Sequence, residues 1–252
     1  MRNLRLIARL DVKAPNLVKG IQFEGLRKLG DPNEFARKYY EQGIDEIFYA
    51  DVVASLYERN SLLDLIKKTT QDIFVPITVG GGLRSVDDVT AALRAGADKV
   101  SINTAAVKDI TFVKEASKKF GTQCMVVAVD AKKTSDGKWE IFTHGGRKNT
   151  GIDATDFSKQ AEENGAGEIL LTSMDKDGTK SGYDLELLNK ITSSVSIPVI
   201  ASGGAGKLEH LYDAIKTGGA SAVLAASIFH YGEFTIKETK EYLKLKNVPI
   251  RL

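Results

Sequence analysis

The 252-residue sequence contains one cysteine, three histidines and almost no net charge. Because Cys124 is alone, an internal disulfide and a metal site made of several cysteines are excluded. The net charge of +2, from 35 basic and 33 acidic residues, gives no general attraction to nucleic acid or membranes. No run approaches the roughly 18 apolar residues of a membrane span, and the charged start MRNLRLIARLDVK is unlike a secretion signal. We therefore expect a cytoplasmic protein without nucleic acid or membrane partners.

Short aliphatic or β-branched runs recur along the chain, and each is followed by a longer amphipathic stretch. The runs are RLIARLD, DEIFYAD, VPITVG, DKVSIN, CMVVAVD, EILLTS, IPVIASG and SAVLAAS. The helical patterns lie at about 32–43, 58–72, 85–95, 108–120, 153–165, 184–194, 207–217 and 233–245. In the third pattern Val86, Val89 and Leu93 share one helical face, which can pack on a sheet. This alternation predicts a parallel sheet, and the length suits a single (β/α)8 TIM barrel.

The two halves of the chain resemble each other. RLIARLDVK around Asp11 matches CMVVAVDAK around Asp130, and VPITVGGGLRSVDDVT matches IPVIASGGAGKLEHLY. The repeat predicts one domain, residues 1–252, built from half-barrels at about 1–120 and 121–252. Eight strands can close into a barrel and leave no exposed edge. A doubly wound open sheet is the alternative, but it gives no reason for a twofold repeat.

Acidic residues stand at the expected ends of several strands, where the active sites of parallel barrels lie. Asp11 and Asp130 occupy equivalent positions in the two halves, so we expect them to face each other across the barrel. One can then remove a proton from a substrate while the other donates one. Asp51 and Asp175 also end strands, but helix capping or pairing with a lysine explains them equally well.

Glycines end the third and seventh runs, and short segments with small or polar residues end the runs that follow them. These are Gly80, Gly81 and Gly82 with SINT at 101–104, and Gly203 and Gly204 with AAS at 225–227. Without a Cβ, backbone N–H groups can approach an anion closely. Each half therefore predicts one phosphate cradle made by two neighbouring loops, and DKDGTKSGYD at 175–184 adds polar backbone to the second.

The connection after the first strand, DVKAPNLVKGIQFEGLRKLGDP, is unusually long and is typical of a lid. Lys19 within it can reach a substrate, although a solvated lysine is equally expected. Of the histidines, only His144 is expected near the mouth, and His210 and His230 do not have metal-ligand spacing with it. We expect no metal and no cofactor.

Long motifs resemble one known family. LDVK, VKG, TVGGG, RAGADKVSINTAAV, FTHGGRKNTGID, GAGEILLTSMDKDGTKSGYDLEL and IASGGAGKLEH are similar to the cyclase subunit of imidazole glycerol phosphate synthase, the HisF family, over nearly the whole chain. The resemblance implies a lyase of histidine biosynthesis. Such an enzyme joins ammonia to phosphoribulosyl-formimino aminoimidazole carboxamide ribotide, and its products are imidazole glycerol phosphate and aminoimidazole carboxamide ribotide. This substrate carries a phosphate at each end.

The resemblance also implies roles for individual residues, with Asp11 and Asp130 as the general acid and base. It implies one phosphate site at Gly82, Asn103 and Thr104, and another at Asp177, Gly178, Gly204, Ala226 and Ser227. A separate glutaminase subunit is implied on the N-terminal face of the barrel. There a charged ring that gates ammonia matches Arg5, Glu46, Lys99 and Glu168. From the residues alone, these four would be solvated surface charges.

Some residues depart from the family pattern. LDVKAPNLVKG replaces the usual LDVKDGRVVKG, Arg9 stands where a small residue is common, and Ala14-Pro15 stiffens a turn. These features resemble a paralogous branch that delivers ammonia for amidination of surface-polysaccharide sugars. An isomerase of the related histidine ribotide is a third possibility, because it shares the two-phosphate barrel.

Overall fold

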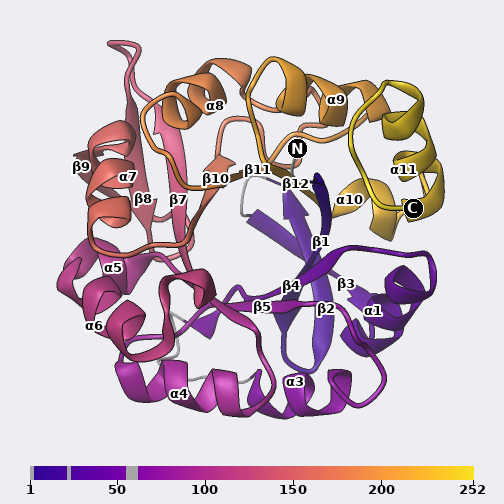
Figure 1. The fold of residues 1–252 in the computed structure, drawn as a ribbon, viewed down its shortest axis with the longest axis horizontal. Coiled ribbons are helices and arrows are strands. Elements are labelled where there is room, and N and C mark those ends of the chain that lie inside the picture. The colour runs from indigo at the N-terminus through magenta and orange to yellow at the C-terminus, as the bar shows by residue number, and fades with distance from the viewer. Residues whose placement is uncertain (1–2, 22–23, 55–61) are drawn as a thin grey trace.

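The computed structural model describes residues 3–21, 24–54 and 62–252. Its centre is a closed barrel of eight parallel strands (Figure 1). The strands are β1 (Arg5–Lys13), β4 (Glu46–Asp51), β5 (Ile77–Gly80), β6 (Lys99–Ile102), β7 (Met125–Lys133), β10 (Glu168–Ser173), β11 (Val199–Ser202) and β12 (Ala222–Ala225). Each pairs in parallel with the next, and β12 pairs with β1. The predicted (β/α)8 barrel is confirmed, and the open sheet is wrong.

Helices surround the barrel on its outer side (Figure 1). They are α1 (Pro32–Glu41), α3 (Leu63–Thr69), α4 (Val86–Arg94), α5 (Thr104–Lys108), α6 (Thr111–Phe120), α7 (Ala154–Glu163), α8 (Leu185–Thr192), α9 (Leu208–Lys216), α10 (Ser227–His230) and α11 (Ile236–Leu245), with the 3-10 turn η1 (Thr122–Cys124). The helix expected at 58–72 lies partly outside the described residues. The helix expected at 108–120 begins later, at Thr111, as α6, and residue 108 is instead the last residue of α5. Asp109 separates the two helices, because its backbone is extended and its carboxylate accepts hydrogen bonds from Thr111.

Alternate residues of the barrel strands build two separate cores. On β1, Leu6, Ala8 and Leu10 point outward and pack with the helices. Ile7 points inward and packs with other buried apolar side chains, namely Phe48, Ala50, Val126, Ala128, Leu170, Ile200, Ala222 and Leu224. Burial on both faces is what a parallel barrel requires, and its interior is a packed core. The same alternation places Arg5, Arg9 and Asp11 on the inward face of β1.

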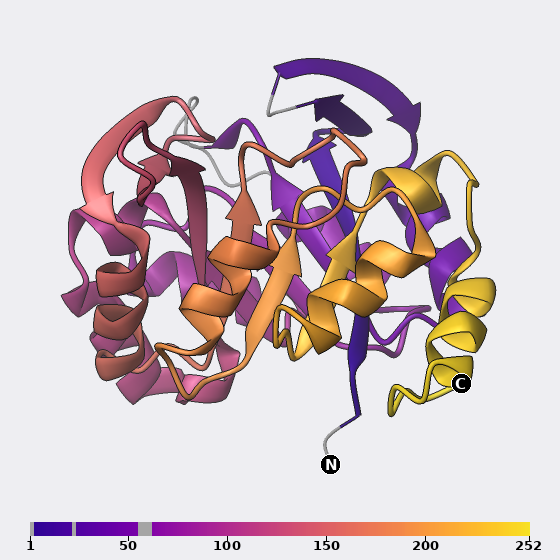
Figure 2. The ribbon, with the colours of Figure 1, turned by 90° about the horizontal axis from the view of Figure 1, so that it is seen from above.

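Two pairs of antiparallel strands extend the barrel beyond its rim. β2 (Asn16–Ile21) pairs with β1, and β3 (Glu24–Gly30) pairs with β2. They curve over the end of the barrel opposite the N-terminus (Figure 2). The connection expected as a long loop is therefore largely a β-ribbon. Period-2 patterning over only six residues, NLVKGI, is too weak to distinguish such a strand from a loop.

A similar ribbon follows the fifth barrel strand. β8 (Trp139–Thr143) pairs antiparallel with β7, and β9 (Lys148–Asp153) pairs with β8. Both halves of the chain thus begin with a strand that continues into an antiparallel ribbon. The division into half-barrels near residue 120 stays a prediction. Within the described ranges, no helix has the length and apolar character needed to cross a bilayer.

Candidate active site

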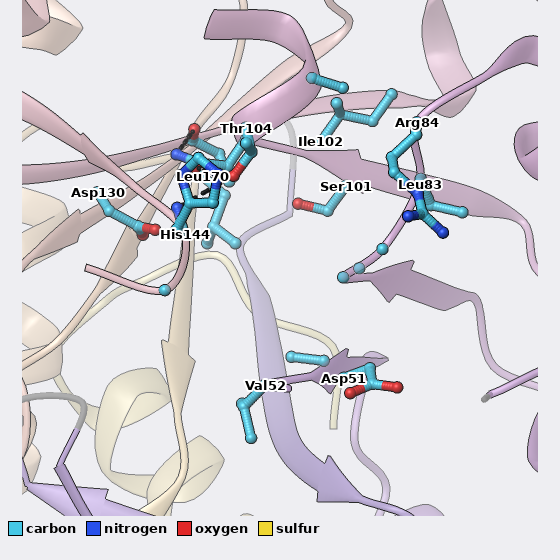
Figure 3. Close-up of a pocket in the computed structure, with 18 of the residues that line it drawn as sticks. Asp51, Val52, Leu83, Arg84, Ser101, Ile102, Thr104, Asp130, His144 and Leu170 are labelled. Atoms are coloured by element: carbon cyan, nitrogen blue, oxygen red, sulfur yellow. Dashed lines mark hydrogen bonds between the residues drawn. The ribbon is translucent and has the colours of Figure 1, made fainter. Parts of the chain in front are cut away.

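Asp11 and Asp130 lie at the carboxyl ends of β1 and β7, the first and fifth strands of the barrel. Their side chains line the same cavity of about 710 Å³ at the barrel mouth. Figure 3 shows Asp130 and His144 on one side of this cavity and Asp51 on the other. The two acids that the repeat predicts to face each other therefore reach one space, which is large enough for a small-molecule substrate.

Two cations contact Asp11. The Arg9 Nε lies 2.6 Å from Asp11 Oδ1, and the Lys19 Nζ lies 3.6 Å from Asp11 Oδ2. Burial by itself would raise the pKa of Asp11, but the charges of Arg9 and Lys19 and the Arg9 hydrogen bond hold that pKa below its usual range. Asp11 is therefore a carboxylate at neutral pH.

Asp130 has a different environment. Burial raises the pKa of Asp130 to about 6, and the more distant charge of Arg9 only partly opposes this. The neighbouring strand places Thr172 beside Asp130 in register, and the Thr172 hydroxyl is buried. A carboxyl group with a pKa near the working pH exchanges protons efficiently in either direction.

The first predicted phosphate cradle lines the 710 Å³ cavity, with Gly80 to Gly82 after β5 and Asn103 and Thr104 after β6. β5 and β6 are neighbours in the barrel, so the two loops meet. Gly81 has a φ of 94°, and a Cβ there would lie 2.3 Å from the Asp51 carbonyl oxygen. The Thr104 hydroxyl accepts a hydrogen bond from the His144 backbone N–H, which ties the cradle to the loop after β8.

The second predicted cradle forms a separate, smaller cavity of about 20 Å³ beside the first. Its lining includes all five predicted residues, Asp177, Gly178, Gly204, Ala226 and Ser227. Gly204 has a φ of 109°, and a Cβ there would lie 2.1 Å from the Gly182 carbonyl oxygen. A space of this size holds about one water molecule, so a phosphate needs the lining to move apart.

Three side chains separate the two cavities. Arg9, Lys19 and Asp177 line both of them, and the Lys19 Nζ lies 3.7 Å from Asp177 Oδ1. Lys19 is buried, so it belongs to the site and is not a solvated lysine. Arg9 was missed as a site residue, although every second residue of RLIARLD faces inward and Arg9 shares that face with Asp11.

Other candidate residues divide between the site and the scaffold. Asp51 lines the large cavity, and its Oδ1 also accepts the Val53 N–H. Asp175 lines neither cavity and accepts the Lys133 N–H. His144 lines the cavity as expected, whereas His210 accepts a backbone N–H at the start of α9.

The site also contains basic residues that sequence reasoning missed, namely Arg84, Lys108 and Arg147. Among the described residues, no three His, Cys, Asp or Glu side chains gather as a metal site would require.

A charged ring lies at the opposite end of the barrel interior. Arg5 contacts Glu46 at 2.7 Å and Glu168 at 2.8 Å, and Lys99 contacts the same two carboxylates at 3.1 and 3.2 Å. The Thr78 hydroxyl donates to Glu46 at 2.6 Å. Glu46 is only 1% exposed and the other three side chains are 12 to 26% exposed, so these residues form a partly buried network and are not solvated surface charges.

A closed parallel barrel with its acids and glycine loops at the carboxyl ends of the strands defines a (β/α)8-barrel enzyme. Residues 5–235 match the family described as "Histidine biosynthesis protein", and the chain belongs to this family. It is 57% identical over 251 residues to "Imidazole glycerol phosphate synthase subunit HisF" of Endomicrobium trichonymphae, with 100% of this chain and 96% of that protein covered. The resemblance to HisF proteins is confirmed.

Proposed function

We propose that this protein is the cyclase subunit of imidazole glycerol phosphate synthase in histidine biosynthesis. It would join ammonia to phosphoribulosyl-formimino aminoimidazole carboxamide ribotide and release imidazole glycerol phosphate and aminoimidazole carboxamide ribotide. The observation that carries the proposal is the placement of Asp11 and Asp130 in one cavity that adjoins a second, glycine-lined cavity. A substrate with a phosphate at each end would span both cavities, and its reacting centre would lie near the acids.

The binding roles follow from the lining of the two cavities. Gly82, Asn103 and Thr104 would hold one phosphate in the large cavity. The other phosphate would enter the small cavity, lined by Gly178, Gly204, Ala226 and Ser227, after Asp177 moves. Lys19 borders both and would contribute its positive charge to either end of the substrate. Asp11 and Asp130 would serve the proton transfers that ring closure and C–N bond cleavage require.

Ammonia would come from a glutaminase subunit on the N-terminal face of the barrel. The ring of Arg5, Glu46, Lys99 and Glu168 supports this, because it lies inside the barrel at that end. The apolar barrel interior separates the ring from the mouth. Neutral ammonia could cross such an interior, whereas ammonium would lose its hydration without compensation. A cytoplasmic location stays a prediction.

Turnover of the ribotide by the purified protein with an ammonium salt tests the proposal. We expect imidazole glycerol phosphate to form, and an Asp130→Asn variant to lack this activity. Restored growth of a histidine auxotroph without the cyclase subunit would support the same conclusion. No turnover with a folded protein would refute it.

Arg9 in the barrel interior favours a second candidate, the delivery of ammonia for amidination of a surface-polysaccharide sugar, because this residue departs from the histidine-pathway pattern. That function predicts a complex with a glutaminase and a sugar amidotransferase, without turnover of the ribotide. The third candidate is an isomerase of the related histidine ribotide. Turnover of the precursor ribotide, without turnover of its isomerised form, would identify this activity.

A further inference from the structure

Arg9 is a cation inside the barrel. It projects from the inward face of β1, its Nε lies 2.6 Å from Asp11 Oδ1, and its guanidinium carbon lies 5.8 Å from the centre of the Phe48 ring. Its side chain is 16% exposed and lines both cavities. Because a buried guanidinium always keeps its charge, the nearest acid must remain ionised to balance it.

The second half of the barrel has no counterpart to this cation. In the repeat, RLIARLD corresponds to CMVVAVD, so Ala128 stands two residues before Asp130 where Arg9 stands two residues before Asp11. Within the part of the chain that the structure describes, no basic side chain forms an ion pair with Asp130. Both acids are aspartates that line the same cavity, but only Asp11 has a cation in direct contact with it.

We propose that Arg9 is a positioning residue that makes the two facing acids unequal. Arg9 holds Asp11 as a carboxylate, which narrows the shared role proposed above: Asp130 exchanges the proton with the substrate, and Asp11 stabilises positive charge that develops opposite it. This division of roles rests on the proposed function for its substrate, but the ionisation of the two acids can be measured without any substrate.

The charges around the two acids support the division. Asp11 faces Arg9, Lys19, His230 and Asp130, and Lys19 also contacts Asp177. Burial lowers the pKa of His230 to about 4, so this ring is neutral at pH 7 and adds no cation. Arg9 and Lys19 therefore balance the carboxylates of Asp11 and Asp177.

Asp130 is the third carboxyl group in this space, and ionising it adds an unbalanced charge. Burial is the main obstacle to its ionisation, and the nearby carboxylates of Asp177 and Asp11 add to it, whereas the charge of Arg9 only partly opposes these effects. The proton therefore stays on Asp130 to a higher pH than on Asp11.

Titration of the free protein by NMR tests the proposal directly. Aspartate carboxyls are labelled with ¹³C, and Asp11→Asn and Asp130→Asn variants assign the two signals. In the unaltered protein we expect Asp130 to titrate near pH 6 and Asp11 below the ordinary value of about 3.9. An Asp11 midpoint at or above that of Asp130 would overturn the proposal without any change at Arg9.

Two substitutions at Arg9 separate charge from packing. Arg9→Gln keeps a polar side chain but removes the cation, so the midpoints of both acids should move upward. Arg9→Lys keeps the charge and should leave Asp11 ionised as before. Unchanged midpoints in folded Arg9→Gln protein would overturn the proposal.

The pH dependence of kcat/KM with the ribotide and ammonium then tests the catalytic consequence. We expect one ionisation near pH 6 in the unaltered protein, an upward shift in Arg9→Gln, and the original profile in Arg9→Lys. A profile that does not move, although the NMR midpoints do, would overturn the assignment of the proton to Asp130. If the ribotide is not turned over at all, the proposed function fails, whereas the titration still decides the ionisation of the two acids.

Discussion

Glu46 and Glu168 share both of their cations, because Arg5 and Lys99 each contact both carboxylates at distances between 2.7 and 3.2 Å. The four side chains form a closed ring across the barrel interior. Above the ring, the interior is filled by apolar residues such as Ile7, Val126 and Ile200. A small molecule that enters from this end must pass the ring before it reaches the acids at the mouth.

The ring predicts different effects of Glu168→Ala on the two nitrogen sources. With a free ammonium salt, ammonia reaches the mouth from solution, so activity should remain within about twofold of the unaltered protein. With glutamine and the glutaminase subunit, the opened ring should lower activity at least about tenfold, which corresponds to about 1.4 kcal/mol. Initial rates with both nitrogen sources measure the difference.

Glu186→Ala is the matched control for this experiment. Glu186 also pairs with a lysine, Lys133, but it is 68% exposed and lies outside the barrel interior. Both of its rates should therefore stay unchanged. An equal loss with ammonium and glutamine in Glu168→Ala would rule out a role of the ring in ammonia passage.

Asp130→Asn should remove most turnover and leave binding nearly unchanged. The amide keeps the size of the side chain but cannot exchange the proton, so kcat should fall by about 10²- to 10⁴-fold while KM stays within a few-fold. Asp175→Asn provides the control, because Asp175 belongs to neither cavity and should lose little activity. A large rise in KM at constant kcat would contradict the proton-transfer role.

Lys19→Met should weaken substrate binding. Lys19 lies between the two cavities and contacts Asp11 and Asp177, so its loss removes a charge-assisted contact and leaves two carboxylates facing the substrate phosphates. We expect KM to rise by about tenfold or more. Lys138→Met, on an exposed lysine, is the control. If KM did not change, Lys19 would have no part in binding.

The sequence predicts those parts of the site that depend on strand order and on the repeat. Asp11 and Asp130 share a cavity because equivalent strand ends converge on one rim of a closed barrel, and both glycine cradles lie where neighbouring strands end. The charged ring cannot be recognised from its residues, because Glu46 and Lys99 stand 53 positions apart and nothing local shows that they pair. Arg9 was accessible in principle through strand alternation, because its partner Asp11 stands two residues further along the same strand and on the same face.

Gly81→Ala should destabilise the protein more than Gly137→Ala. Both glycines have positive φ angles, 94° and 80°, so both substitutions add backbone strain. Only at Gly81 would the new Cβ meet backbone atoms, the Asp51 oxygen at 2.3 Å, whereas nothing lies within 4 Å at Gly137. We expect Gly137→Ala to cost about 1 kcal/mol and Gly81→Ala at least about 2 kcal/mol more, measured by denaturant unfolding. Equal losses would show that the loop after β5 relaxes freely.

Asp130→Asn should stabilise the protein at neutral pH although it removes activity. The pKa of Asp130 is raised to about 6 in the folded protein, against about 3.9 when unfolded. Between these values the folded protein binds more protons, so the free energy of unfolding falls as pH rises through this window. At pH 7.5 the unaltered protein should be less stable than Asp130→Asn by roughly 2 to 3 kcal/mol, and the difference should vanish near pH 4. Urea unfolding at both pH values measures this.

The Asp11→Asn substitution should have the opposite effect on stability and lower the free energy of unfolding at neutral pH. The cations Arg9 and Lys19 lower the pKa of Asp11, so its carboxylate contributes stability above the pKa of the unfolded chain and loses it as pH falls. Removing that carboxylate leaves Arg9 as a buried cation without its 2.6 Å partner, which should destabilise the protein at pH 7.5 by about 3 kcal/mol or more. Because both substitutions convert an acid at the same mouth to the same amide, packing changes cannot explain opposite signs. Two shifts in the same direction would show that Arg9 does not distinguish the acids.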